Sequence, residues 1–273
     1  MMENQKLEEL ERLCLKIRKE IAGYGCQSGR GHISSALSMV EILTVLYFGI
    51  NMDLQKIKAR SMDRDRVILS KGHAGLALYT VLANAGVIEK EALDGFASAE
   101  GALSTHPVFG AAEGIEMSAG SLGQGLGFAC GAALAEKIRR RGYQTYVITG
   151  DGELQEGSNW ESMLFASQMQ LNGLTLIIDR NGLQITGKVD DIVSVSPLKE
   201  KLTAFGFYTL EIDGHSLQEI ESALNQKSGR KPKAIIANTV KGKGIPFIEN
   251  KDGWHGKGLT LQQYQEYISG LER

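Results

Sequence analysis

Short apolar runs alternate along the chain with stretches in which apolar residues recur at helical spacing. The runs at 66–70, 146–149, 174–178, 206–212 and 234–238 have the length and β-branched content of buried strands. Helical spacing covers 6–21, 37–48, 74–85, 122–141, 156–170 and the segment after Thr260. Strands that alternate with helices predict an α/β fold: a mostly parallel sheet with helices on both faces.

Glycine marks several boundaries in this pattern. Four glycines between positions 23 and 31 predict that the first helix ends there, and the apolar character of 37–48 on all sides predicts a buried helix. The segment 101–120 has no periodicity, which in a compact protein is typical of a functional loop. Because no repeat, low-complexity tract or linker interrupts the chain, we expect one domain over 1–273.

Polar side chains follow two of the predicted strands. Asp151 lies in Gly150-Asp151-Gly152, directly after the run at 146–149, and Asn181 follows the run at 174–178. The helical stretch between them makes a βαβ unit, so both loops open at one edge of the sheet, where such folds bind ligands. Carboxylate and amide oxygens are hard ligands for Mg²⁺ or Ca²⁺, and a backbone carbonyl just after Asn181 would add another. Each motif alone would be read as a turn, but together they predict a metal–diphosphate site.

Four of the five histidines lie in glycine-rich loops: His32, His73, His106 and His255. His73 follows the strand at 66–70, which is the same topological position as that of Asp151. A single histidine in a loop is usually structural, but four favour one shared site, since imidazole carries protons near neutral pH.

Three other polar residues are expected to be structural or solvated. His215 precedes Ser216 and Glu219, which have the spacing of a helix capping box. Lys241 and Lys243 follow the last strand, and we expect them to be solvated rather than in contact with phosphate.

Composition narrows the class of protein. With 42% hydrophobic residues, the 273-residue chain can bury a sizeable core, and its net charge of −2 gives no basic surface for nucleic acid or an anionic membrane. The three cysteines are odd in number and lack metal-binding spacing, as expected in the reducing cytoplasm, with Cys14 and Cys130 in the core. The polar N-terminus is unlike a secretory signal, and no apolar run approaches the ~20 residues of a membrane span.

The span from Gly150 to Asn181 resembles the thiamine diphosphate signature, which starts Gly-Asp-Gly and ends in Asn, and the string 150–157 resembles transketolase in particular. Further strings extend this resemblance over essentially the whole chain: Ser70 to Ala74, His106-Pro107, Gly120 to Gly125, and Trp254-His255-Gly256. One departure is that the family's His-Pro-Gly is His32-Ile33-Ser34 here.

The resemblance implies a role for each matching residue. Asp151, Asn181 and the Leu183 carbonyl match the family's metal ligands. Gly152 and His73 match diphosphate contacts, as do Asn181 and His255, while Gly120 and Leu122 match the seat of the aminopyrimidine. Glu156 matches an acid at the contact between cofactor domains, and the histidines that face the sugar in the family match His32, His106 and His255.

The resemblance also implies a reaction and a partner. Transketolases move a two-carbon ketol unit between sugar phosphates, and the glutamate that activates the cofactor lies on a second domain. We therefore expect the N-terminal subunit of a split transketolase, which is active with a C-terminal partner chain in an assembly of two copies of each. Two alternatives stay open: the α subunit of a 2-oxoacid dehydrogenase, and a non-catalytic cofactor-binding remnant. The histidine set and the Gly120 to Gly125 string favour transketolase.

Overall fold

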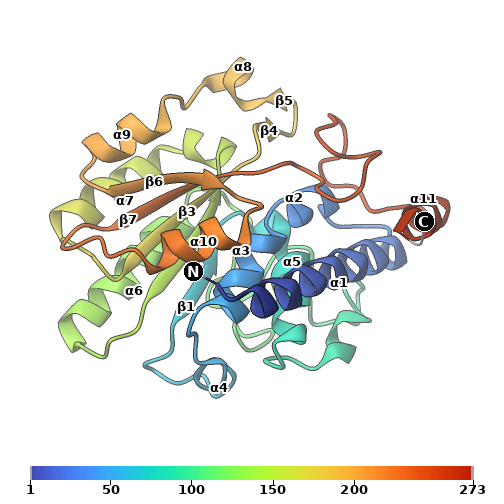
Figure 1. Cartoon of the computed structure of the whole chain (residues 1–273), viewed down its shortest axis with the longest axis horizontal. Coiled ribbons are helices and arrows are strands. Elements are labelled where there is room, and N and C mark those ends of the chain that lie inside the picture. Colours follow the sequence, from blue (N-terminus) through green and yellow to red (C-terminus); the bar gives the residue numbers. More distant parts are fainter. Residues whose placement is uncertain (1, 272–273) are drawn as a thin grey trace.

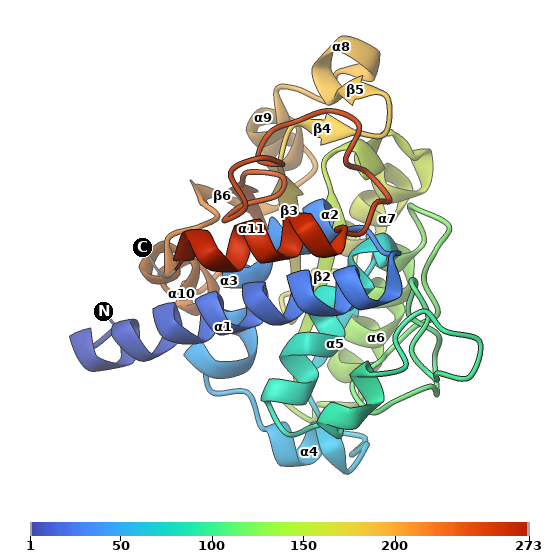
Figure 2. The same cartoon turned by 90° about the vertical axis from the view of Figure 1, so that its right-hand side faces the viewer.

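A computed structural model describes residues 2–271 and shows a five-stranded sheet between layers of helices (Figures 1 and 2). The sheet order is β1-β2-β3-β7-β6, and every neighbouring pair is parallel. The strands are β1 (Arg66–Leu69), β2 (Thr145–Gly150), β3 (Leu174–Arg180), β6 (Tyr208–Asp213) and β7 (Lys233–Asn238). All five predicted strands are confirmed to within two residues, as is the α/β fold with a parallel sheet.

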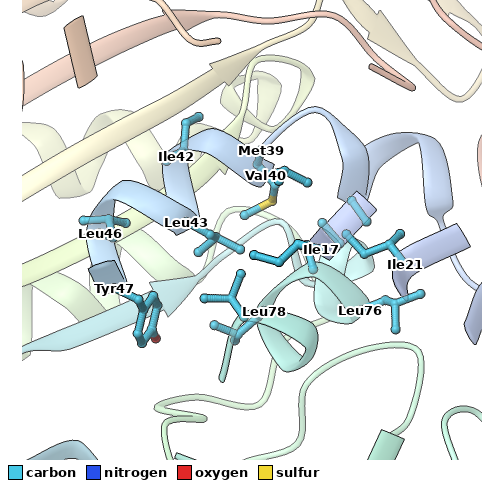
Figure 3. Close-up of a cluster of buried hydrophobic side chains, with 14 of the residues drawn as sticks. Ile17, Ile21, Met39, Val40, Ile42, Leu43, Leu46, Tyr47, Leu76 and Leu78 are labelled. Atoms are coloured by element: carbon cyan, nitrogen blue, oxygen red, sulfur yellow. The ribbon is translucent and has the colours of Figure 1, made fainter. Parts of the chain in front are cut away.

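Helices cover both faces of the sheet because alternate residues of each buried strand point to opposite sides. On β2, Ile148 packs into one apolar cluster and Val147 into the other. The first cluster contains side chains of α1 (Asn4–Ser28), α3 (Val40–Thr44), α5 (Gly75–Asn84) and α10 (Leu217–Asn225). The second contains side chains of α6 (Gly125–Arg139), α7 (Gly157–Gln168) and α9 (Leu198–Ala204). Figure 3 shows Ile17 and Ile21 of α1 beside Leu76 and Leu78 of α5 in the first cluster.

Shorter elements and the last helix complete the fold. Helix α11 (Leu261–Leu271) lies along α1 (Figure 2). The remaining elements are α2 (Ile33–Leu37), η1 (Val45–Gly49), α4 (Leu54–Lys58), η2 (Gly72–Ala74), η3 (Lys90–Leu93), η4 (Gly152–Gln155), β4 (Leu183–Gln184), β5 (Gly187–Lys188) and α8 (Val189–Val193). Within residues 2–271, no helix combines the length and the apolar character needed to cross a membrane.

The first helix is longer than its glycines predicted. It continues through Gly23 and Gly25 and ends at Gly29, whose φ of 60° is the left-handed conformation typical of a helix C-terminus. Gly25 serves close packing instead, since a Cβ there would lie 2.3 Å from Cδ1 of Ile33. The prediction of an end at position 21 was therefore wrong.

The buried helix expected at 37–48 is found at 40–49, after a turn that separates it from α2. The chain turns at Ser38 and Met39, resumes as α3, and closes with the π-helical turn η1. Ser38 is fully buried and its hydroxyl lies 2.6 Å from the Asp179 carboxylate at the end of β3. The break in the helix coincides with this polar contact, which a hydrophobicity pattern does not record.

Candidate functional site

The carboxyl ends of β1, β2, β3 and β7 open onto one cavity of about 320 Å³. Its lining includes most of the residues singled out from the sequence: His73, Leu122, Asp151, Gly152, Glu156, Asn181, Leu183 and His255. Gly120, His32 and His106 do not line the cavity. His32 lies against His73, which does, and His106 lies against His32 and Gly120. The cavity thus lies where the βαβ unit predicts a ligand site, at the edge where the parallel strands end.

Hydrogen bonds hold the loops after β2 and β3 together. Asp151 accepts from the backbone N–H of Gly152 at 2.9 Å and of Gly182 at 2.8 Å. The side chain of Asn181 donates to Asp179 at 3.3 Å, and its Oδ1 accepts from the N–H of Leu183 at 3.1 Å. The amide orientation of Asn181 is therefore set, and Asp151 and Asn181 both line the cavity.

The oxygen donors of this edge fit a hard divalent cation. Asp151 is 4% exposed, and burial, then the nearby Asp179 carboxylate, raises the pKa of Asp151 to about 6. A carboxylate that is costly to ionise is one that a cation would stabilise. Within residues 2–271, no three His, Cys, Asp or Glu side chains are grouped to hold a metal. A cation at Asp151 would accordingly complete its shell with oxygens from a phosphate ligand, as Mg²⁺ commonly does.

Two buried lysines bring positive charge to the same cavity. Lys71 is 1% exposed, and its Nζ pairs with Asp179 and donates to the Ser35 carbonyl at 3.2 Å. Lys241 is 3% exposed, and its Nζ donates to the Leu183 carbonyl at 3.1 Å. Burial, then repulsion from Lys71, lowers the pKa of Lys241 to about 8. Both ammonium groups are thus placed for an anionic ligand.

The two lysines correct the sequence analysis. Lys241 was expected to be solvated, and that prediction was wrong because its loop folds back over the ends of β3 and β7. Lys243 does remain partly exposed, 4.0 Å from Glu249. Lys71 was missed, although its place between Ser70 and His73 at the end of β1 was a signal for it.

The four loop histidines are brought together around His32. Its ring centroid lies 5.3 Å from that of His73, 5.5 Å from that of His106 and 4.9 Å from that of His255. Burial, then repulsion from His106, lowers the pKa of His32 to about 4, while burial and Lys241 do the same for His255. Burial, then Lys71, holds the pKa of His73 well below its usual value. These three rings are therefore neutral near pH 7, each with one N–H donor and one nitrogen acceptor.

The polar atoms of His32 and His215 indicate different roles. His32 Nδ1 is buried and has no hydrogen-bond partner among the described residues, which is uncommon for a buried polar atom. His215 lies apart from the cluster, where Nε2 accepts from the N–H of Val240 at 2.8 Å and Nδ1 lies 3.0 Å from Glu41. The structural role expected for His215 agrees with these contacts. At the start of α10, the hydroxyl of Ser216 accepts from the N–H of Glu219, as the capping sequence predicted.

Close backbone packing joins the loop at 101–120 to the end of β1. A Cβ on Gly72 would lie 2.5 Å from Cβ of Ala119 and 3.1 Å from the nitrogen of Gly120. The N–H of Ala119 donates to the Pro107 carbonyl at 2.9 Å, which closes the loop that carries His106. The segment 101–120 is thus packed against the loop after β1, next to the cavity. Glu156, at the N-terminus of α7, is exposed at the edge of the cavity.

Comparison with known proteins agrees with this geometry. The family model described as "Transketolase, thiamine diphosphate binding domain" matches residues 21–268. Two bacterial relatives, from Phocaeicola vulgatus and Actinobacillus succinogenes, are each named as one subunit of an apulose-4-phosphate transketolase. The first is 37% identical over 96% of this chain and 94% of its own length, and the second is 41% identical over 93% and 92%.

Longer proteins match over part of their length. Human transketolase is 38% identical over 98% of this chain but over 43% of its own length. The solved transketolase structure from Campylobacter jejuni has a TM-score of 0.87 and 29% identity, and covers 99% of this chain and 43% of the longer one.

Proposed function

Because this chain belongs to the transketolase family, through its thiamine diphosphate-binding domain, we propose that it binds thiamine diphosphate and Mg²⁺ or Ca²⁺ in the cavity at the strand ends. We further propose that it is the N-terminal subunit of a two-chain transketolase that moves a two-carbon ketol unit between sugar phosphates. The observation that carries the proposal is the meeting of oxygen donors, buried lysines and four imidazoles at one sheet edge. The family match favours transketolase over a 2-oxoacid dehydrogenase.

Different residues of the site would bind the two ends of the cofactor, the metal-bound diphosphate and the aminopyrimidine. Asp151, Asn181 and the Leu183 carbonyl would hold the metal together with diphosphate oxygens. The diphosphate would also meet the N–H of Gly152 and four cationic or hydrogen-bonding side chains: Lys71, His73, Lys241 and His255. Gly120 and Leu122 would seat the aminopyrimidine.

The bound cofactor supplies a carbanion at C2, and the chain's own residues prepare the sugar. His32 and His106 lie beyond the cavity wall formed by His73 and His255. The neutral His32 ring can accept a proton from a sugar hydroxyl or donate a hydrogen bond to its oxygen.

A partner subunit supplies the rest of the site in this proposal. The two bacterial relatives named as single subunits are covered by this chain over more than nine tenths of their length, so the present chain corresponds to one subunit of such an enzyme. The partner would bring the pyrimidine-binding domain and its carboxylic acid to the side where Glu156 is exposed. Two copies of each chain with two composite sites would give the closed symmetry usual for such assemblies.

The test is to isolate the chain with its co-purifying partner and to measure both cofactor binding and ketol transfer. We expect calorimetric binding of thiamine diphosphate that requires Mg²⁺ or Ca²⁺, and turnover of a ketose phosphate with an aldose phosphate. A complex that binds no thiamine diphosphate in the presence of either cation would contradict the proposal.

A further inference from the structure

A buried carboxylate joins three of the loops that surround the cavity. Glu153 is 3% exposed and lies in η4, two residues after Asp151. Its Oε1 accepts a hydrogen bond from the Ser70 hydroxyl. The same oxygen also accepts from the N–H of Gly123, at 2.9 Å. Its Oε2 accepts from the N–H of Gly150 at 3.0 Å. One side chain therefore binds the ends of β1 and β2 and the segment that leads into α6.

Each of these three loops carries a proposed cofactor contact close to the bonded atom. Ser70 is followed by Lys71 and His73, Gly123 follows Leu122, and Gly150 precedes Asp151. We propose that Glu153 is a positioning residue. It would hold the loops after β1 and β2 and the segment before α6 at fixed positions relative to one another, so that their diphosphate, metal and pyrimidine contacts meet one cofactor. This proposal rests on the function proposed above. The backbone that carries this side chain is itself anchored, because Asn159 Nδ2 donates to the main-chain carbonyl of Glu153 at 2.7 Å.

The hydrogen-bond directions require an acceptor at both oxygens of Glu153. The Ser70 oxygen accepts from the N–H of Gly125 at 3.1 Å, so its single proton is directed to Glu153. Gly123 and Gly150 can only donate through their N–H groups. A glutamine at position 153 would keep the shape, but one of its ends would place an amide N–H against another N–H. Since Oε1 faces two donors and Oε2 faces one, that conflict falls at Gly150, next to Asp151.

The experiment compares Glu153→Gln with Glu116→Gln in the complex of this chain and its partner. Glu116 is a matched control, because it is 6% exposed and bound to Arg64 by two contacts of 2.7 Å but does not line the cavity. We expect Glu153→Gln to weaken calorimetric binding of Mg²⁺–thiamine diphosphate by about 10- to 100-fold, as for other groups that orient ligands. At saturating cofactor, kcat should return to within about threefold of wild type. Glu116→Gln should lower the Tm of the cofactor-free protein and leave cofactor affinity within about twofold.

Ser70→Ala provides a second variant if Glu153→Gln is poorly folded. It removes one donor to Glu153 and the acceptor of Gly125, so it should weaken cofactor binding, and its effect should be less than additive with that of Glu153→Gln. Wild-type affinity in either folded variant would overturn the inference, as would an equal loss in Glu116→Gln. A wild-type complex without cofactor affinity would instead contradict the proposed function, so the two failures are distinguishable.

Discussion

The surroundings of Asp151 both oppose and favour its ionised form, and a bound cation would stabilise that form. Its carboxylate is buried beside Asp179, which raises its pKa, yet its oxygens also accept from Gly152 and Gly182. We predict that Asp151→Asn, whose oxygen can keep one of these N–H groups while its amide N–H faces the other, folds with a slightly lower Tm and loses metal-dependent binding of thiamine diphosphate. Calorimetry with and without Mg²⁺ measures the binding, and thermal unfolding without cofactor measures the fold. Wild-type affinity in this variant would rule out Asp151 as a metal ligand.

The histidines should divide between cofactor and substrate. His73 lines the cavity whereas His106 does not, although both rings lie beside His32. We predict that His73→Ala mainly weakens cofactor affinity, and that His106→Ala mainly lowers kcat on the sugar by about 10²–10⁴-fold, the range for acid–base groups. Cofactor titration and steady-state kinetics on the assembled enzyme separate the two. Unchanged kcat and KM in His106→Ala would contradict its assignment.

The sequence revealed the site residues that directly follow a strand, because the loops after parallel strands meet at one edge of the sheet. It did not reveal the residues whose role depends on contacts with distant parts of the chain. Asp151, Asn181 and His73 follow strands, so the parallel sheet alone puts them at one edge. Lys71 and Glu153 occupy the same loops, but their importance arises from burial and from partners 108 and 83 positions away along the chain. A single sequence does not show such partners.

At the scale of elements, glycines that allow two loops to pack closely are distinct from glycines that face open space on a helix. Gly72 has ordinary backbone angles but faces the backbone of Ala119 and Gly120, whereas a Cβ added at Gly131 in α6 would have no heavy atom within 4 Å. We predict that Gly72→Ala destabilises the protein by about 1–3 kcal/mol through overpacking and weakens cofactor binding. Gly131→Ala should stabilise it by roughly 0.5–1 kcal/mol. Denaturant unfolding of both variants measures whether the free energy of unfolding falls in Gly72→Ala and rises in Gly131→Ala. Equal changes in the two variants would contradict the close contact at Gly72.

The same distinction explains which helices were predicted well. Periodicity indicated α5, α6 and α7, and each of these helices is unbroken from end to end and packs its apolar side chains into one of the two clusters. It failed for α1, where Gly25 is required by contact with Ile33, and at Ser38, where a polar bond to Asp179 interrupts the helix. Both failures come from contacts between elements distant in the chain.

For the whole molecule, an unpartnered apolar surface adjoins the proposed cofactor site. Phe128, in the first turn of α6, is 47% exposed, and Leu164 and Phe165 of α7 are 60% and 43% exposed. Helices α6 and α7 pack against each other, and both begin beside the cavity, at Gly125 and Gly157. Exposed apolar side chains on neighbouring helices are typical of an interface. We therefore expect the partner subunit to cover this surface.

The last prediction is that the purified chain is inactive by itself and that a charge at Phe128 prevents its activation. In the proposed function, this chain's cavity binds the metal and the diphosphate, and the partner supplies the acid that activates the pyrimidine, so turnover should appear only in the mixture. Phe128→Glu should weaken association by at least about tenfold, because burying an unpaired carboxylate opposes docking. Ile138→Glu, at the far end of α6 and 73% exposed, is the matched control and should assemble normally. Light scattering and a ketol-transfer assay on each mixture check both. Robust turnover by the chain alone would contradict the two-subunit proposal, whereas normal assembly of Phe128→Glu would place the interface on another surface.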